Sequence, residues 1–96
     1  MQAMIRYRLK ADQLQPDRRL LDAVYDELAA TRPQDVRYAT FALEDGVSFI
    51  ALVEGGGAGR FSQLESFRAY RQGLDDRCAE PPVLTELHDV RSYRFP

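Results

Sequence analysis

The chain is short of the residues from which proteins build disulfides and metal sites. Its 96 residues include one cysteine, one histidine and no tryptophan, and asparagine is also absent. With Cys78 alone an intrachain disulfide is impossible, and the reducing cytoplasm is the expected compartment. A zinc site needs several Cys or His ligands, and no carboxylates have ligand spacing. We therefore expect neither a metal nor a cofactor.

Long apolar runs and an excess of basic charge are also missing. No segment approaches the roughly 18 consecutive apolar residues of a membrane span, and the first residues, MQAMIRYRLK, lack a signal-peptide core. The formal net charge is −2 and the pI is about 5.3. Because phosphate binding needs a clustered basic surface, this balance argues against nucleic acid. Neither a membrane nor a nucleic acid is an expected partner.

What remains is the composition of an ordinary globular protein, with 45% hydrophobic and 29% charged residues. A single core usually contains about 100–150 residues, so residues 1–96 are expected to form one domain.

The first half of the chain predicts a strand and then a helix. Ile5, Tyr7 and Leu9 alternate with Arg6 and Arg8, which indicates a strand with one apolar face. The helix is expected to begin near residue 16 and to end before residue 33, both prolines. Its apolar stripe has helical spacing. The stripe consists of Leu20, Leu21, Val24, Tyr25 and Leu28.

The middle of the chain predicts a hairpin. Residues 36–43 and 47–53 have the composition of strands, and Asp45–Gly46 between them is a tight-turn signal. Residues 54–60 are rich in glycine and are expected to form a loop.

A second helix is expected from Ser62, because Glu65 three residues later completes a capping box. Its apolar stripe extends to Cys78, with a bend or break expected at Gly73. Residues 83–88 predict a fourth strand, and residues 90–95 predict its continuation or a short extra strand. The order β-α-β-β-α-β predicts a ferredoxin-like α+β sandwich, with two helices on one face of a four-stranded antiparallel sheet.

The strand at residues 47–53 is apolar on both faces. Val47, Phe49 and Ala51 alternate with Ile50 and Leu52. Helices cover one face of such a sheet, and an uncovered apolar face implies a partner, most simply a second copy. The sequence therefore predicts a homodimer.

Four segments, MIRYRLK, LEDGVSFIALVE, LESFRAYRQGL and PPVLTELHDVRSYRF, resemble the dimeric α+β barrel superfamily, above all the antibiotic-biosynthesis monooxygenase-like family. The resemblance implies two sheets that face each other across a dimer and enclose a pocket. Members include cofactor-free oxygenases, haem degraders, isomerases and proteins with no known activity. Several of them use an Asn–Trp–His set, which this chain lacks because it has neither Asn nor Trp. The resemblance therefore supports the scaffold and leaves the chemistry open.

His88 is the candidate catalytic residue, because histidine is the side chain that most often transfers protons near neutral pH. If Val83 and Leu87 contact the core, Glu86 and His88 point to the other face, where Glu86 orients His88 only loosely. Arg6 and Arg8 share the polar face of the first strand. In a dimer with facing sheets they would line the enclosed space and favour an anionic or phenolate ligand.

Tyr38, Thr40 and Ser48 are further candidate ligand contacts, through their hydroxyl groups. The sequence thus favours a homodimer that holds a small aromatic or anionic molecule between its sheets, with cofactor-independent oxygenation as one hypothesis. The first alternative is a non-catalytic dimer whose interface is filled by its own side chains. The second is an RNA-binding domain of the same topology, of whose third-strand signature only Phe49 is present.

Overall fold

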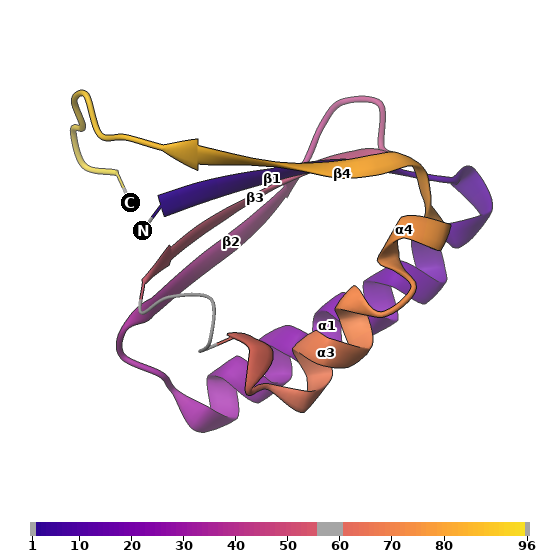
Figure 1. Ribbon diagram of the computed structural model, residues 1–96, viewed down its shortest axis with the longest axis horizontal. Helices are drawn as coiled ribbons and strands as arrows, with labels where there is room; N and C mark the ends of the chain where they lie inside the picture. Colours follow the sequence, from indigo (N-terminus) through magenta and orange to yellow (C-terminus); the bar gives the residue numbers. More distant parts are fainter. Residues whose placement is uncertain (1, 56–60, 96) are drawn as a thin grey trace.

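The computed structural model describes residues 2–55 and 61–95. Its strands are β1 (Gln2–Leu9), β2 (Val36–Ala42), β3 (Ser48–Gly55) and β4 (Cys78–Leu87). Its helices are the short 3₁₀ helix η1 (Ala11–Gln13), α1 (Leu14–Thr31), α3 (Glu65–Arg71) and α4 (Leu74–Arg77). The strands form one antiparallel sheet in the order β2-β3-β1-β4, and the helices lie together on one side of it (Figure 1). This arrangement confirms the predicted ferredoxin-like α+β fold.

The predicted hairpin is present between β2 and β3. Gly46 has φ 75°, and the Asp45 carboxylate accepts hydrogen bonds from the backbone N–H groups of Val47 at 3.0 Å and Ser48 at 2.8 Å. The Ser48 hydroxyl also donates to Asp45, at 2.6 Å. These bonds hold the pKa of Asp45 below its ordinary value, with the Ser48 hydroxyl as the largest cause. The turn chemistry therefore sets the register of β2 against β3.

The second helix differs from the prediction at its start and at its end. It begins at Glu65 with Leu64 as its N-cap and has no side-chain capping bond, so the predicted capping box is wrong. The Glu27 carboxylate of α1 instead accepts bonds from the backbone N–H and the hydroxyl of Ser66, which satisfies the start of α3. The helix breaks at Gly73, as expected, where φ is 82°.

The end of the second helix also differs from the prediction, because Cys78 begins β4 and is not part of the helix. Pro81 and Pro82 lie inside this strand, which is possible because β4 is at the edge of the sheet and its register against β1 shifts between Arg6 and Arg8, as at a bulge. Residues 90–95 form no strand. The loop was expected at 54–60, but Glu54 and Gly55 belong to β3, and residues 56–60 lie outside the described residues.

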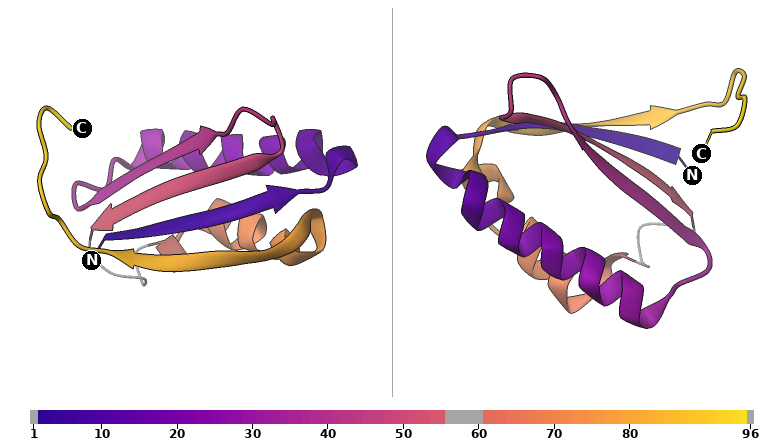
Figure 2. Two further views of the ribbon diagram at one scale, coloured as in Figure 1. Left: turned by 90° about the horizontal axis from the view of Figure 1, so that it is seen from above. Right: turned by 180° about the vertical axis from the view of Figure 1, so that it is seen from behind.

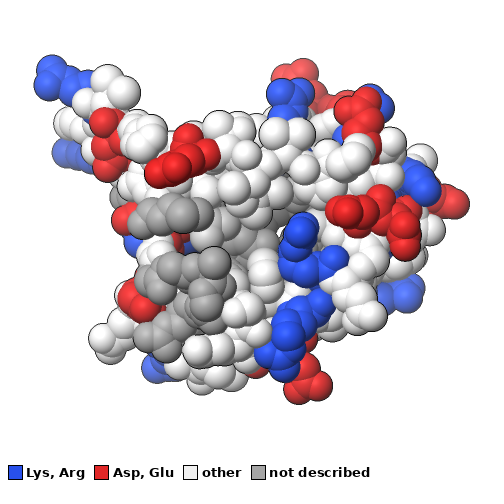
Figure 3. All heavy atoms as spheres, viewed as in Figure 1, with Lys and Arg blue, Asp and Glu red and all other residues white. Residues whose placement is uncertain are grey.

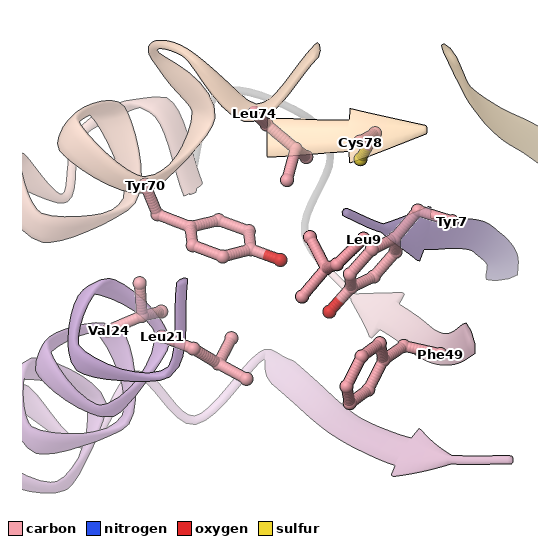
Figure 4. Close-up of a cluster of buried hydrophobic side chains, with 8 residues drawn as sticks. All are labelled: Tyr7, Leu9, Leu21, Val24, Phe49, Tyr70, Leu74 and Cys78. Atoms are coloured by element: carbon pink, nitrogen blue, oxygen red, sulfur yellow. The ribbon is translucent and has the colours of Figure 1, made fainter. Parts of the chain in front are cut away.

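The core lies between the sheet and the helices (Figure 4). It consists of Tyr7, Leu9, Leu21, Val24, Phe49, Tyr70, Leu74 and Cys78. Tyr7 stacks on Phe49 with ring centroids 5.3 Å apart, and burial raises the pKa of Tyr7 to about 12. The apolar face of β1 therefore packs against the helices, and its arginines point the other way.

A buried ion pair lies next to this core. The Arg77 Nε atom donates to the Asp17 carboxylate at 2.9 Å, and the two residues are 8% and 2% exposed. Arg77 also donates to the carbonyl oxygens of Tyr70 at 2.7 Å and Gln72 at 3.3 Å. The pair joins the first turn of α1 to the connection between α3 and β4. Among the described residues, no helix is long and apolar enough to cross a membrane.

Replacing Gly55 with alanine should destabilise the domain strongly. Gly55 has φ 127°, and a Cβ atom there would lie 1.6 Å from the Asp35 carbonyl oxygen. Backbone strain costs about 1–3 kcal/mol and steric overlap about as much again. Gly46→Ala is the matched control, because a Cβ at Gly46 meets no atom within 4 Å and only the left-handed φ costs free energy, about 1–2 kcal/mol. Urea unfolding compares the two variants, and equal losses would contradict the expected close approach of backbone at Gly55.

Candidate functional site

The face of the sheet opposite the helices, called here the open face, is apolar in its centre. The strand registers place Met4, Ile50 and Leu52 together on this face, beside Phe41 and Val83. Phe41 is 47% exposed and Val83 is 59% exposed. No described helix covers them (Figure 2). The second apolar face expected from the sequence is therefore present.

The last described residues, 88–95, leave the end of β4 and are called here the arm. The arm lies on the open-face side of the sheet (Figure 1). A cavity of about 820 Å³, the sheet–arm cavity, lies between the arm and the sheet. Ala39, Phe41 and Leu52 supply its apolar lining, and Arg37 and His88 supply charge and a titratable group. Its volume falls within the range of about 300–1,000 Å³ that is usual for small-molecule sites.

A second cavity of about 520 Å³ lies farther along the open face, toward the hairpin that joins β2 and β3. Arg6, Arg8 and Ser48 all line it. Arg8 donates to Glu80 at 2.9 Å, an ion pair in which both side chains are at least half exposed. The structure thus brings together three of the residues that the sequence singled out, and their positive charge is partly balanced by Glu80 and Asp45.

The orientation expected for β4 is wrong. Val83 lies opposite Arg6 and Leu87 lies opposite Gln2, so Val83 and Leu87 are on the open face. Glu86 lies opposite Ala3, on the helix side of the sheet. On the helix side of this end of β4, Leu84 is 62% exposed and Glu86 is also exposed, so burial against a helix does not distinguish the two faces of the strand. His88 follows the end of the strand and lines the sheet–arm cavity.

The Nε2 atom of His88 lies 4.0 Å from the Glu86 carboxylate, which is too long for a hydrogen bond. Glu86 therefore does not fix the orientation of the His88 ring. The His88 side chain is 81% exposed in the single chain.

Tyr38 and Thr40 lie on the helix side of β2. Tyr38 stacks on Tyr25 at 5.1 Å, and the hydroxyl groups of Tyr25 and Thr40 are 2.8 Å apart. Burial raises the pKa of Tyr38. Tyr38 also contributes to the lining of the sheet–arm cavity, whereas Thr40 does not line either cavity described above. Of the predicted site residues, His88 and Tyr38 thus line the sheet–arm cavity, and Arg6, Arg8 and Ser48 line the second cavity. Thr40 and Glu86 line neither of these cavities.

Sequence reasoning missed Arg37 and Arg91, which line the sheet–arm cavity. Arg37 lies 3.5 Å from the Glu54 carboxylate on the neighbouring strand. The alternation of Arg37, Ala39 and Phe41 along β2 was a usable signal, because it places the arginine on the same face as two apolar residues. In residues 2–55 and 61–95 there is no cluster of three or more His, Cys, Asp or Glu that could hold a metal ion.

Comparison with known proteins shows the fold. No protein family model and no curated protein sequence matches the chain. A solved antibiotic biosynthesis monooxygenase is similar over 94% of this chain and 98% of its own, with a TM-score of 0.75 and 11% identity. Rv0793 from Mycobacterium tuberculosis is similar over 95% of both chains, with a TM-score of 0.74 and 18% identity.

SnoaB, a cofactor-independent oxygenase from Streptomyces nogalater, is similar over 93% of both chains, with a TM-score of 0.62 and 13% identity. The chain therefore has the α+β fold of antibiotic biosynthesis monooxygenase-like proteins, as the resemblance in the sequence predicted. Identities below 20% leave the activity to be argued from the site itself.

Proposed function

We propose that the protein is a homodimer that binds a small aromatic or anionic organic molecule in the sheet–arm cavity. The observation that carries the proposal is the combination, in one cavity of about 820 Å³, of an apolar lining with Arg37 and His88. In a homodimer the open face of a second copy would cover the cavity and exclude water from it. Exclusion of water would strengthen each charged contact with the ligand.

The lining favours a flat ligand with an acidic group. Phe41 and Leu52 offer apolar contact for a ring, and the Arg37 guanidinium offers charge-assisted hydrogen bonds to a phenolate or carboxylate. His88 would accept the proton of a phenol. Ligand binding, ligand orientation and proton transfer would therefore use only side chains of the protein, without a cofactor.

Oxygenation is the reaction that the fold neighbours favour. Once His88 has taken the phenol proton, the electron-rich anion can react with O₂ at an adjacent activated CH₂ group. One oxygen atom enters the substrate as a carbonyl and the other leaves as water, and the carbon supplies all four electrons. No metal or external reductant is then required.

Arg37→Ala should weaken an anionic ligand about tenfold to a hundredfold and leave a neutral ligand of the same shape nearly unaffected. A shielded charge-assisted hydrogen bond contributes about 1.5–3 kcal/mol, which corresponds to that range of Kd. A thermal-shift screen of phenols, quinols and short carboxylates supplies the ligand, and calorimetry measures both affinities. Equal losses for the two ligands would overturn the role of the charge.

Arg8→Ala is measured beside Arg37→Ala, because Arg8 lines the second cavity only. The sequence predicts that Arg6 and Arg8 select anions, and this stays a prediction that the same titration tests. If Arg8→Ala alone lowers the affinity, the ligand occupies the second cavity and the proposed site is wrong. If no member of the screen binds, the alternative of a non-catalytic dimer with a filled interface is favoured.

A further inference from the structure

Arg6 is the cation of the open face that lacks a counter-charge. The other arginines that the strand registers place on this face have acidic partners. Arg8 donates to Glu80 at 2.9 Å, and Arg37 lies 3.5 Å from the Glu54 carboxylate. In the part of the chain that the structure describes, the Arg6 side chain forms no ion pair and no hydrogen bond. Its charge is therefore available to an anion from outside the chain.

The neighbours of Arg6 on the sheet are apolar. Ile50 lies opposite Arg6 on β3, and Val83 lies opposite it on β4. In the single chain Arg6 is exposed, so water solvates its guanidinium group. In the proposed homodimer the open face of the second copy would cover Arg6 and remove that water. A guanidinium group buried without a counter-charge destabilises the structure that buries it. The homodimer therefore requires an anion beside Arg6.

The open face of a second copy brings no free carboxylate to Arg6. Among the described residues, the acidic side chains that the strand registers place on this face are Glu54 and Glu80, and both already contact arginines of their own chain. Asp45, at the hairpin end of the second cavity, accepts three hydrogen bonds within its own turn. Basic and acidic side chains lie side by side over this hairpin (Figure 3). The missing anion is therefore more simply a solute than a side chain.

The second cavity offers hydrogen-bond donors to such an anion. Thr85 lies opposite Met4 and thus diagonally across from Arg6, a separation of about 7–8 Å that a long arginine side chain can span. Arg6 and Thr85 both line the cavity, and the Thr85 hydroxyl forms no hydrogen bond with another described side chain. The planar guanidinium group matches the paired oxygens of phosphates and carboxylates. The donors of this cavity therefore suit a small oxyanion.

We propose that the second cavity binds a small oxyanion, a phosphate or a carboxylate, between Arg6 and Thr85 when two copies associate. The site is complete only in the dimer, because the open face of the partner excludes water from it and so strengthens the contact with the anion. Arg6 does not line the sheet–arm cavity, so this anion is distinct from the ligand proposed above. The inference rests on the proposed homodimer and adds a means of regulating it, since an anion that binds only the dimer strengthens the dimer.

Sedimentation equilibrium of the full chain tests the proposal. The dimer should show twice the 11.0 kDa of one chain, and its dissociation constant should fall about tenfold or more when inorganic phosphate replaces chloride at constant ionic strength. The same titration with acetate distinguishes the two oxyanions, because a response to acetate alone identifies a carboxylate site. A dissociation constant that responds to neither anion would overturn the anion site and leave the homodimer standing.

Arg6→Met removes the charge and keeps a long side chain. This variant should dimerise more tightly than the native chain in chloride, and it should lose the response to oxyanions. Arg19→Met is the matched control, because it removes the same charge from an exposed position on α1, on the other side of the sheet. Equal responses in the two variants would contradict a specific role of Arg6. A native chain that sediments as a monomer with and without oxyanions would overturn the homodimer, and with it the proposed function.

Discussion

Arg77→Leu should destabilise the protein by about 3–5 kcal/mol, because it leaves the Asp17 carboxylate buried without a counter-charge. For a domain of this size each kcal/mol lowers Tm by about 4–8 °C. The loss is a large part of the roughly 5–15 kcal/mol that stabilises a typical domain. Urea unfolding monitored by circular dichroism measures it directly.

Arg8→Leu is the control for this experiment. Arg8 donates to Glu80 at the same distance of 2.9 Å, but their side chains are 50% and 70% exposed. An exposed pair contributes about 0–1 kcal/mol, so this variant should remain close to the native stability. The double variant Asp17→Leu/Arg77→Leu should recover the part of the loss that comes from the isolated carboxylate. If Arg77→Leu costs no more than Arg8→Leu, the pair is not buried as described.

The effect of Arg77→Leu should also depend on pH. Burial raises the pKa of Asp17 above its ordinary 3.8, and Arg77 opposes this rise by hydrogen bonding and by its charge. Without Arg77 the folded-state pKa rises further. A carboxyl group whose folded pKa exceeds its unfolded pKa favours folding fully below the unfolded value, and this contribution is lost as pH rises through the folded value. The deficit of the variant should therefore be smaller near about pH 4 than near pH 7.

His88→Gln should lower turnover by about 100-fold or more while changing ligand affinity by less than about threefold, if the proposed oxygenation takes place. Loss of a general base usually costs this much, and glutamine keeps the approximate size and polarity of the side chain. Oxygen uptake with a phenolic ligand from the screen measures turnover, and calorimetry measures affinity.

Glu86→Gln provides the comparison, since the Glu86 carboxylate lies 4.0 Å from Nε2 and does not hydrogen-bond to it. Turnover should then fall less than about threefold, as expected for an exposed charge pair. Native protein that binds the ligand and consumes no oxygen would contradict the enzymatic hypothesis. A large loss in Glu86→Gln would show that the carboxylate positions His88 during the reaction.

Local patterns in the sequence determined the elements and most of the topology. The alternation of Ile5, Tyr7 and Leu9 with arginines is a property of five consecutive residues, and it predicted which face of β1 packs on the helices. Asp45–Gly46 predicted the hairpin because turn chemistry depends only on neighbouring residues. The unusual second apolar face of β3 was also visible, since side chains alternate along any strand.

Long-range contacts were decided by the tertiary structure alone. Asp17 and Arg77 are separated by 60 positions, and each looks like an ordinary surface charge in its own segment. The orientation of β4 was predicted wrongly because Leu84 and Glu86, on the helix side of its outer end, are exposed, so apolar residues there do not indicate which face points to the helices. The sheet–arm cavity likewise joins Arg37 to His88 from opposite edges of the sheet. Such groupings depend on how the elements pack, and local periodicity does not encode which distant segment lies alongside.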